Sequence, residues 1–337
     1  MLQNYNMLPL MVGSLPYTDP DKACEKVKQY FDKTPCWPQL PVKDPREGMI
    51  QQVVNGLPGI SLVDGKYIMD IESADMDEFE AFVTRAMTED YSQSGLAEYE
   101  ASGLYAMQKC DWGEPVLVKG QLCGPVTLAL SIFDKSGKSV IYDDTVTDLI
   151  TKHIKLKAMW LENELKKISP NTLVCFDEPS LTAYGSGFFS CPPERLTALI
   201  AEVESAVQGL SAVHSCGETF WPIVTNTAVD IISLDAIDYG QRLNLYAKDL
   251  ADFFARGGSI AWGIVPTAAE KLQSTTAQQL SFLLSAIMDR LKFQGVDEEH
   301  MYSNSFITPA CGLAGLDEQD AEKALALTKE VADAVRR

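Results

Sequence analysis

The sequence is poor in several features that would mark common protein classes. It has only three histidines, His153, His214 and His300, and none of its eight cysteines forms a C-x-x-C pair. Its net charge of −19 argues against a nucleic acid or an anionic membrane as partner. No apolar run reaches the roughly 18 residues that span a bilayer, and the first residues lack the basic start of a signal peptide. We therefore expect a cytoplasmic protein that binds neither nucleic acid nor membrane.

The composition is that of a globular protein with a full core. Hydrophobic residues make up 46% and charged residues 22% of the 337 residues, which are ordinary values for a folded enzyme. Without an export signal the cysteines are expected to be reduced, and most of them to serve packing, as Cys123 and Cys175 do in predicted strands. His153 lies in a long helical pattern and His300 in an acidic segment, so we expect both to face solvent.

Short apolar runs alternate with helical patterns along the chain. No G-x-G-x-x-G follows the first run, which disfavours a dinucleotide-binding open sheet. Runs such as residues 229–234 resemble parallel strands that are buried on both faces. We predict an α/β fold, a single (β/α)8 TIM barrel formed by residues 1–337 as one domain, with an open doubly wound sheet as the alternative. The eight strands are expected near Leu8, Pro35, Val116, Thr172, Leu210, Val229, Ser259 and Ser305.

An insertion is expected between the second and third strands. Residues 59–71 contain two short apolar pieces around Asp64-Gly65, and Asp-Gly is a strong hairpin signal. A helical pattern follows from residue 75 to 108. We predict a hairpin-containing insertion at about residues 57–110. Helices outside it are predicted at 19–31, 143–168 and 318–335 from their caps and apolar spacing.

Side chains that can ligate a metal gather where predicted strands end. His214 and Cys216 end the fifth strand, Asp235 ends the sixth, and Cys311 follows the eighth. Residues i and i+2 of a strand share a face, so His214 and Cys216 point the same way. Barrel active sites lie at the carboxyl ends of the strands, so we expect these four side chains to converge. Taken singly, each has an ordinary structural interpretation in the core or in a turn.

The ligand set predicts a zinc ion. Two thiolates, one imidazole and one carboxylate suit Zn²⁺, and the spacing is too long for a zinc finger. We predict zinc on His214, Cys216, Asp235 and Cys311, with Asp235 as the weak ligand that yields an exchangeable position and Glu218 as its alternative. A coordinated thiol is deprotonated, and lowering its pKa from about 8.5 to below 7 is worth roughly 2 kcal/mol. The chemistry expected is alkylation of a thiolate.

Six short motifs occur in order along nearly the whole chain. They are Val12-Gly13-Ser14-Leu15-Pro16, the stretch from Val118-Lys119-Gly120 to Cys123-Gly124-Pro125-Val126-Thr127, Phe176-Asp177-Glu178-Pro179, His214-Ser215-Cys216, Ser233-Leu234-Asp235 and Thr308-Pro309-Ala310-Cys311-Gly312-Leu313. Together they resemble the carboxy-terminal barrel of cobalamin-independent methionine synthase. That family shares a superfamily with uroporphyrinogen decarboxylase and the methylcobalamin:coenzyme M methyltransferases. Each motif is weak alone, but six in order are specific.

The resemblance implies a thiol methyltransferase with zinc on His214, Cys216 and Cys311. Asp235 replaces the glutamate of the family at the fourth position. Asp177 is implied as a catalytic residue beside these ligands.

The resemblance also implies how the acceptor is held. Ser14 lies near the carboxylate of the substrate amino acid and Asp177 near its ammonium, a charge pairing that suits homocysteine. Glu178 shares the strand end with Asp177 and is a further candidate for substrate binding. The glutamate that holds the amine in the family falls near Lys43 here, so Glu47 or Asp44 has to take its place.

One departure from the family bears on the methyl donor. The proton-donating histidine of the family is missing after the seventh strand, where residues 263–267 read Gly-Ile-Val-Pro-Thr. Methyl-folate needs a protonated leaving nitrogen, whereas cob(I)alamin leaves without an acid. We therefore predict methylcobalamin, carried on a corrinoid protein, as donor and homocysteine as acceptor, giving methionine. Coenzyme M as acceptor and methyl-folate as donor are the alternatives.

Other readings of the sequence remain open. The loop at residues 181–190, with Gly185 and Gly187, is either a mobile cover for the barrel mouth or an ordinary loop. A metal-free decarboxylase of the uroporphyrinogen type would need several arginines, yet among the motif-bearing strand ends only Arg46 is offered. A non-catalytic barrel in which zinc has only a structural role is the alternative in which the protein is not an enzyme.

Overall fold

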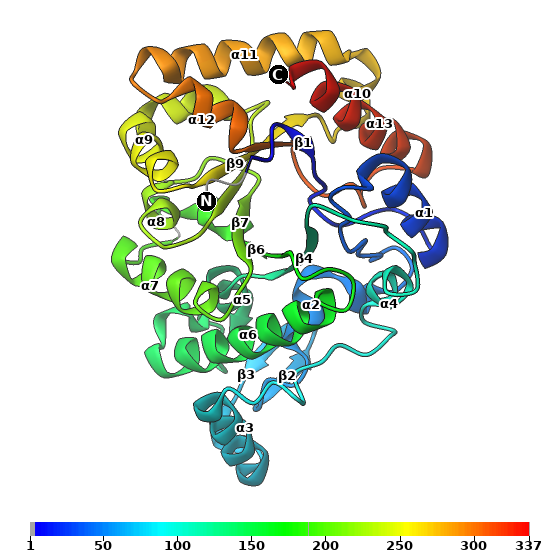
Figure 1. Ribbon diagram of the computed structural model, residues 1–337. Coiled ribbons are helices and arrows are strands. Elements are labelled where there is room, and N and C mark those ends of the chain that lie inside the picture. The colour runs from blue at the N-terminus through cyan, green and yellow to red at the C-terminus, as the bar shows by residue number, and fades with distance from the viewer. Residues whose placement is uncertain (1–3, 188, 337) are drawn as a thin grey trace.

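The computed structural model describes residues 4–187 and 189–336 and contains a curled parallel sheet surrounded by helices (Figure 1). Each strand of this sheet pairs in parallel with its neighbours. In sheet order the seven strands are β1 (Leu8–Pro9), β10 (Ser305–Pro309), β9 (Ser259–Val265), β8 (Ile231–Asp235), β7 (Leu210–Ser215), β6 (Thr172–Asp177) and β4 (Val118–Cys123). The mixed α/β class and the parallel arrangement follow the prediction.

The predicted second strand is the exception. Residues 35–39 form only isolated bridges, Cys36 with Lys119 and Gln39 with Ser14. Prolines at positions 35 and 38 have no N–H to donate, so a regular ladder cannot continue through this segment. The sheet therefore has seven regular strands instead of the eight predicted. We call residues 12–14, 35–39 and 118–121 the seam, because here the two edges of the curled sheet meet through a non-strand segment.

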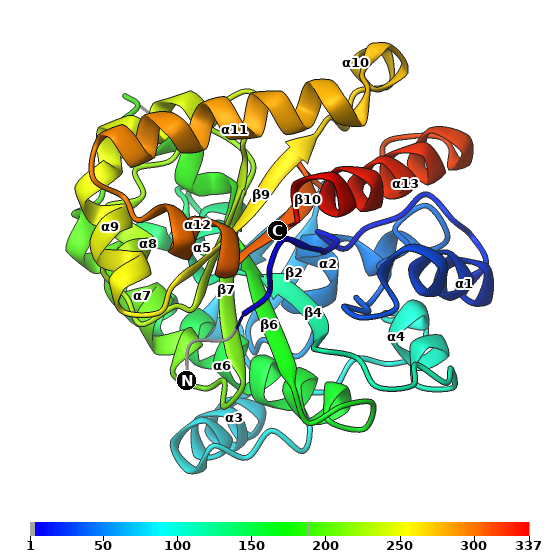
Figure 2. The same ribbon diagram turned by 45° about the horizontal axis from the view of Figure 1, so that its top comes forward.

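Helices cover the outer face of the sheet, and Figure 2 shows α11 and α13 lying beside β9 and β10. Asp19 caps α1 by accepting from the N–H groups of Asp21 and Lys22, and the prediction of residues 318–335 for the last helix is confirmed. The helices on the body are α1 (Pro20–Phe31), α2 (Met49–Val54), α5 (Pro125–Ser131), α6 (Asp144–Leu165), α7 (Pro193–Glu204), α8 (Pro222–Thr225), α9 (Ala247–Ala255), α10 (Ala269–Ser274), α11 (Ala277–Phe293), α12 (Glu298–Ser303) and α13 (Glu318–Val335). No helix among the described residues is long and apolar enough to cross a lipid bilayer.

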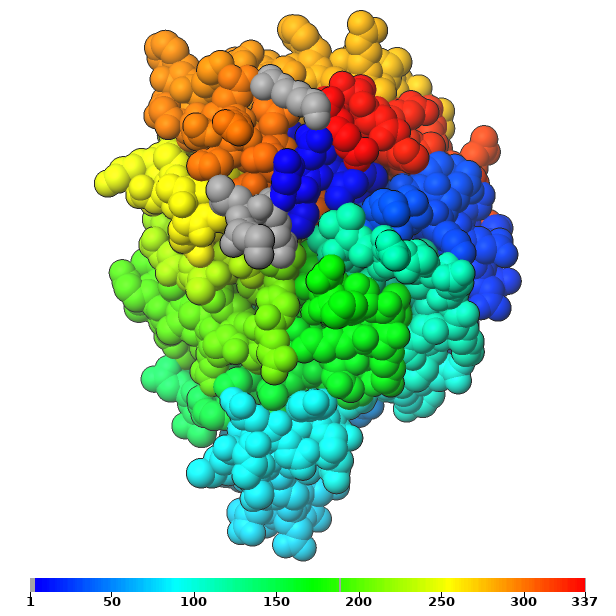
Figure 3. Space-filling view, in the orientation of Figure 1, coloured from blue at the N-terminus to red at the C-terminus, as the bar shows by residue number. Residues whose placement is uncertain are grey.

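The segment between residue 39 and β4 contains the predicted hairpin. Strands β2 (Ile60–Val63) and β3 (Lys66–Met69) pair antiparallel, and their turn places Asp64 and Gly65 at φ of 49° and 76°, where glycine is favoured. A third short strand, β5 (Ile132–Phe133), joins β3 in parallel. α3 (Met76–Thr88), which follows the hairpin in the chain, protrudes from the body, as Figure 3 shows in cyan. α4 (Ser102–Met107) comes next, before β4.

The inner face of the curled sheet is divided into two layers. One layer is apolar and consists of Tyr5, Leu10, Leu117, Leu173, Cys175, Ala212, Ile231, Ala261 and Phe306. Toward the carboxyl ends of the strands the buried side chains turn polar, and they include Lys119, Gln121, Asp177, His214 and Ser233. Buried polar groups need partners, so this polar layer is a candidate position for a binding site. Cys123 and Cys175 are buried, as expected for packing residues.

Candidate metal and substrate site

Three of the predicted ligands meet at the carboxyl edge of the sheet. His214 lies near the end of β7, Cys216 follows that strand, and Cys311 follows β10. One ligand atom from each lies within 4.8 Å of the other two, the only such group of three metal-ligating side chains among the described residues. The register of the parallel strands brings these residues together, although almost 100 positions separate the two thiols in the sequence.

The imidazole of His214 is arranged as a metal ligand would be. Its Nδ1 lies 2.9 Å from the Ser233 hydroxyl oxygen, and Ser233 is the in-register neighbour of His214 on β8. Its Nε2 is fully buried and has no hydrogen-bond partner. An unsatisfied buried nitrogen is costly, while metal-bound histidines bond through one nitrogen and are oriented through the other. The side chains present therefore fit a zinc ion.

The two thiols interact directly. The hydrogen bond from the Cys311 thiol, assisted by His214, lowers the pKa of Cys216. The same hydrogen bond, together with burial, raises the pKa of Cys311. A cation bound beside the two sulfurs would take both as thiolates.

Asp235 and Glu218, the two candidates for a fourth ligand, do not join this group. Oδ1 of Asp235 accepts from the backbone N–H of Asp238 at 3.0 Å, and burial raises the pKa of its carboxyl group. Glu218 forms an ion pair with Arg242, and both side chains are more than half exposed. The geometry brings together three protein ligands and leaves both carboxylates outside.

A cavity of about 310 Å³ opens beside the three ligands, within the usual range for small-molecule sites. Its lining unites the metal-ligating side chains with three other predicted residues, Ser14, Glu47 and Asp177. The lining residues are Val12, Ser14, Gln39, Pro41, Glu47, Gly48, Met49, Asp177, Pro179, His214, Cys216, Cys311, Gly312, Ala314 and Gly315. The cavity is large enough for an amino acid of the size of homocysteine.

The two predicted acceptor-binding residues lie on different parts of the cavity wall. Asp177 ends β6 with 9% of its surface exposed, and burial raises the pKa of its carboxyl group although His214 and Lys119 oppose this effect. Ser14 belongs to the seam, and its carbonyl oxygen accepts from the Leu313 N–H at 2.8 Å. A Cβ atom on Gly312 would lie 2.1 Å from Ser14 Oγ, so a side chain at this position would displace the Ser14 hydroxyl.

The two glutamates predicted to bind substrate differ in position. Glu47 lines the cavity, but one carboxylate oxygen accepts from the Leu40 N–H and the other from the N–H and hydroxyl of Ser102. Glu178 is fully buried, and its two oxygens accept from the N–H groups of Val126 and Thr127 at 2.8 and 2.7 Å. Burial raises the pKa of Glu178 to about 7. Glu178 thus anchors the start of α5 and is not part of the cavity lining.

Asp44 and Arg46, which follow the seam segment 35–39 in the chain, bind each other. The guanidinium of Arg46 donates to both oxygens of the Asp44 carboxylate through Nε and Nη2, and it lies over the Tyr99 ring, 4.1 Å from the ring centroid. Asp44 is therefore engaged with a cation of this chain. Neither residue belongs to the cavity lining.

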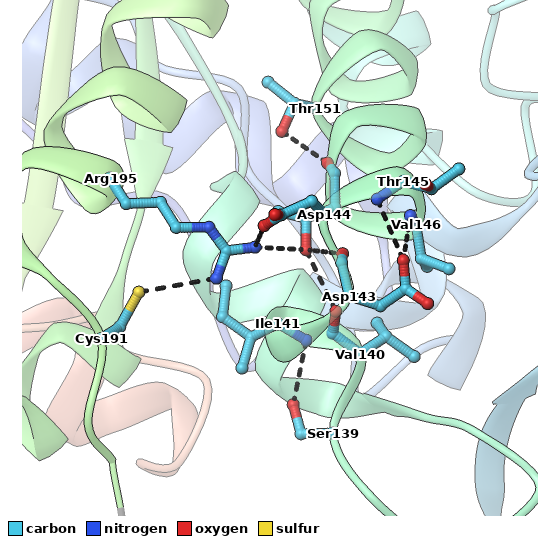
Figure 4. Close-up of polar contacts among 11 residues, drawn as sticks. Ser139, Val140, Ile141, Asp143, Asp144, Thr145, Val146, Thr151, Cys191 and Arg195 are labelled. Atoms are coloured by element: carbon cyan, nitrogen blue, oxygen red, sulfur yellow. Dashed lines mark hydrogen bonds and ion pairs between the residues drawn. The ribbon is translucent and has the colours of Figure 1, made fainter.

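The loop after β6 is tied down at both ends. It begins in a short 3₁₀ helix, Pro179–Ala183, whose Ser180 N–H donates to Thr127 Oγ1 at 3.1 Å. At the other end Arg195 of α7 forms an ion pair with Asp144 at 2.7 Å and lies 3.7 Å from Cys191 Sγ, as Figure 4 shows. Residue 188 lies outside the described residues. Movement of this loop as a cover stays a prediction.

The other two histidines are far from this site in structure. His153 is buried, not exposed as predicted, and its Nε2 lies 2.7 Å from the Val53 carbonyl oxygen. The prediction was wrong because α6 is covered by α2 and the insertion, a tertiary contact that helical periodicity does not show. His300 lies in α12, which precedes β10 and so lies at the opposite end of that strand from Cys311.

Sequence reasoning missed the partners of the predicted residues. Ser233 was noted only as part of a motif, although its position two residues before Asp235 puts both on one face of β8. Gln39 lines the cavity from a segment whose register no sequence pattern fixed. Both act through contacts between strands, which become visible once the register is known.

The fold and the cavity define an α/β enzyme whose site lies at the carboxyl ends of parallel strands. A sequence model of the family "Cobalamin-independent synthase, Catalytic domain" matches residues 105–334. The chain therefore belongs to this family and is an enzyme of the methyltransferase class. None of the curated proteins matches it significantly.

Solved structures share the fold at low sequence identity. A B12-independent methionine synthase from Shewanella sp. W3-18-1, in complex with selenomethionine, has a TM-score of 0.58 and 15% identity over 98% of this chain and 97% of its own. A putative vitamin-B12 independent methionine synthase from Listeria monocytogenes has a TM-score of 0.57 and 15% identity over 95% of this chain and 86% of its own. A methyltransferase from Methanosarcina mazei has a TM-score of 0.53 and 12% identity over 96% of this chain and 94% of its own. At these identities the likeness supports the fold alone.

Proposed function

We propose that this protein transfers a methyl group to the thiol of homocysteine, with zinc held by His214, Cys216 and Cys311. The observation that carries the proposal is the convergence of one imidazole and two thiols within 4.8 Å beside a cavity, with the Nε2 of that imidazole buried and unpaired. The family supports methyl transfer as the reaction class.

The proposed chemistry needs a thiolate at neutral pH. A zinc ion held by His214, Cys216 and Cys311 would supply it by lowering the pKa of the acceptor thiol. His214 is held in one orientation by Ser233, and the two cysteines give an electron-rich site that favours alkylation over hydrolysis. Asp235 and Glu218 stay outside this ligand set, so three protein ligands leave room for the substrate.

The cavity wall is proposed to orient the amino acid part of the acceptor. Asp177 carries the charge that pairs with an ammonium group, and Ser14 offers a hydroxyl to a carboxylate. Both line the cavity that the thiols also line. Holding the sulfur and the methyl group in line is the main contribution such a wall makes to the rate.

We propose methylcobalamin, presented by a corrinoid protein, as the methyl donor. A donor such as methyl-folate needs an acid at its leaving nitrogen, and neither of the remaining histidines lies at the site, because His153 packs against α2 and His300 lies in α12. The family is described as cobalamin-independent, which points instead to methyl-folate. The experiment therefore includes both donors.

The test is methyl transfer by the purified zinc-loaded protein, with methylcobalamin or methyl-tetrahydrofolate and with homocysteine, coenzyme M or no thiol. We expect methionine from methylcobalamin and homocysteine, detected by mass spectrometry. Cys311→Ala should slow transfer at least about 30-fold, because only a few per cent of a free thiol is thiolate at pH 7. Cys24→Ala, which removes a buried cysteine of α1, is the control. If no thiol accelerated loss of the methyl group from either donor, the proposal would be contradicted.

A further inference from the structure

Lys119 is a buried lysine on the inner face of the curled sheet, outside the cavity lining. It is the second residue of β4, only 3% exposed, and its side chain points to the inside of the curled sheet. Its Nζ donates to the Val12 carbonyl oxygen at 2.5 Å and to Gln121 Oε1 at 3.0 Å, and lies 3.8 Å from Cys36 Sγ. Both oxygen partners are neutral, and no carboxylate bonds to Nζ directly. Burial opposes the charged form, while Cys36, Cys175 and Asp177 raise the pKa of Lys119, so the buried ammonium is kept charged by its surroundings.

The partners of Lys119 belong to all three segments of the seam. Val12 comes from the segment after β1, Cys36 from the bridging segment, and Gln121 from β4. Gln121 Nε2 in turn donates to the Trp37 carbonyl oxygen at 2.9 Å, and a Cβ atom on Gly13 would lie 2.6 Å from the Gln121 side chain. The seam has only a few backbone hydrogen bonds, such as Trp37 N–H to the Lys119 carbonyl oxygen at 2.9 Å, and these two side chains add further connections.

Part of the seam lines the same cavity as the proposed zinc ligands. Val12, Ser14 and Gln39 line the cavity, and the Leu15 N–H donates to the Gln39 carbonyl oxygen at 2.9 Å. Lys119 does not line the cavity. Any effect it has on a ligand must therefore pass through the residues that it holds.

We propose that Lys119 is a positioning residue that fixes the Val12–Ser14 wall and so sets the affinity for the acid group of the acceptor. The hydrogen bond to the Val12 carbonyl holds the backbone two residues before Ser14, and the buried positive charge favours an anionic group on the other side of that wall. Lys119 thus selects acceptors that carry a carboxylate. This inference rests on the proposed function, since it takes homocysteine as the acceptor.

The test compares two acceptors that differ only in the acid group, homocysteine and 3-mercaptopropylamine, by calorimetric binding to the zinc-loaded protein. Lys119→Met and the gentler Lys119→Gln, which keeps a hydrogen-bond donor, should weaken homocysteine binding about tenfold, the value of one such hydrogen bond. Binding of 3-mercaptopropylamine should change less than about twofold. Lys157→Met removes another buried lysine, on α6, and should change neither affinity. Zinc content should be the same in all variants.

Hydrogen exchange gives a readout that does not depend on substrate. The Leu15 N–H should exchange faster in Lys119→Met than in the unaltered protein and in Lys157→Met, because methionine at position 119 has no donor for the Val12 carbonyl oxygen. Equal weakening of both acceptors, or unchanged binding of homocysteine, would overturn the inference alone. Failure of the unaltered protein to bind homocysteine would overturn the proposed function and the inference with it.

Discussion

Two buried histidines lie in two regions of this molecule and are used in opposite ways. His214, at the strand-end site, is 4% exposed and leaves Nε2 without a protein partner. His153, where α6 meets α2, is 3% exposed, and its Nε2 bonds to the Val53 carbonyl oxygen. Burial is the same in both regions, so burial does not distinguish a ligand from a packing residue. A nitrogen without a hydrogen-bond partner, on a side chain grouped with two thiols, does.

The two regions also differ in how they were built. The strand-end site depends on the register of adjacent parallel strands, which places Ser233 opposite His214. The α6 region depends on one helix covering another, which brings a backbone carbonyl to the imidazole. At the strand-end site, Nε2 of His214 is left without a hydrogen-bond partner, which a cation can supply. In the α6 region, Nε2 of His153 is already bonded. The predictions below separate the two cases.

The larger effect is expected from Ser233→Ala. Loss of the hydroxyl frees the Nδ1 side of His214, and loss of such a supporting contact typically weakens metal binding about 10- to 100-fold. Zinc affinity is measured by competition with a chromophoric chelator. His153→Gln is the matched variant and should leave zinc affinity unchanged. Equal zinc affinity in Ser233→Ala and the unaltered protein would show that Ser233 does not orient the ligand.

The smaller effect concerns the pH dependence of stability. Burial lowers the pKa of His153 to about 3, whereas in the unfolded chain it is about 6.5. Between these values only the unfolded state binds the proton, so the stability from neutral His153 is complete above pH 6.5 and is lost as pH falls. At pH 5 the loss is about 2 kcal/mol.

Urea unfolding at pH 8, 6.5 and 5 measures this effect. The free energy of unfolding of His153→Gln should fall less between pH 8 and pH 5 than that of the unaltered protein. Other acid groups titrate alike in both proteins, so the difference between the two curves isolates His153. Parallel curves would mean that His153 titrates normally in the folded state.

Patterns within one element were predictable from sequence. The last helix was predicted at its observed bounds, and the Asp64-Gly65 turn marked the hairpin. The carboxyl ends of predicted strands also located His214, Cys216 and Cys311. These predictions need only local periodicity and the rule that parallel strands end at one edge.

Features that depend on contacts between distant residues were not predictable. The isolated bridges at residues 35–39 replace a strand because prolines interrupt the ladder, and the side chains of Lys119 and Gln121 add hydrogen bonds to the few that the backbone makes there. Glu178 anchors α5, and Asp235 binds the Asp238 N–H. A carboxylate at a strand end has the same sequence signature whether it faces a ligand or a backbone amide. Only the register and the neighbouring helix decide between them.

The central claim is that His214, Cys216 and Cys311 bind one zinc ion together. X-ray absorption at the zinc edge of the purified protein tests it most directly. The account predicts about one zinc per chain with two sulfur ligands at about 2.3 Å and at least one nitrogen ligand at about 2.0–2.1 Å. Zinc surrounded only by oxygen and nitrogen ligands, or a protein that holds no zinc when supplied with it, would contradict the account.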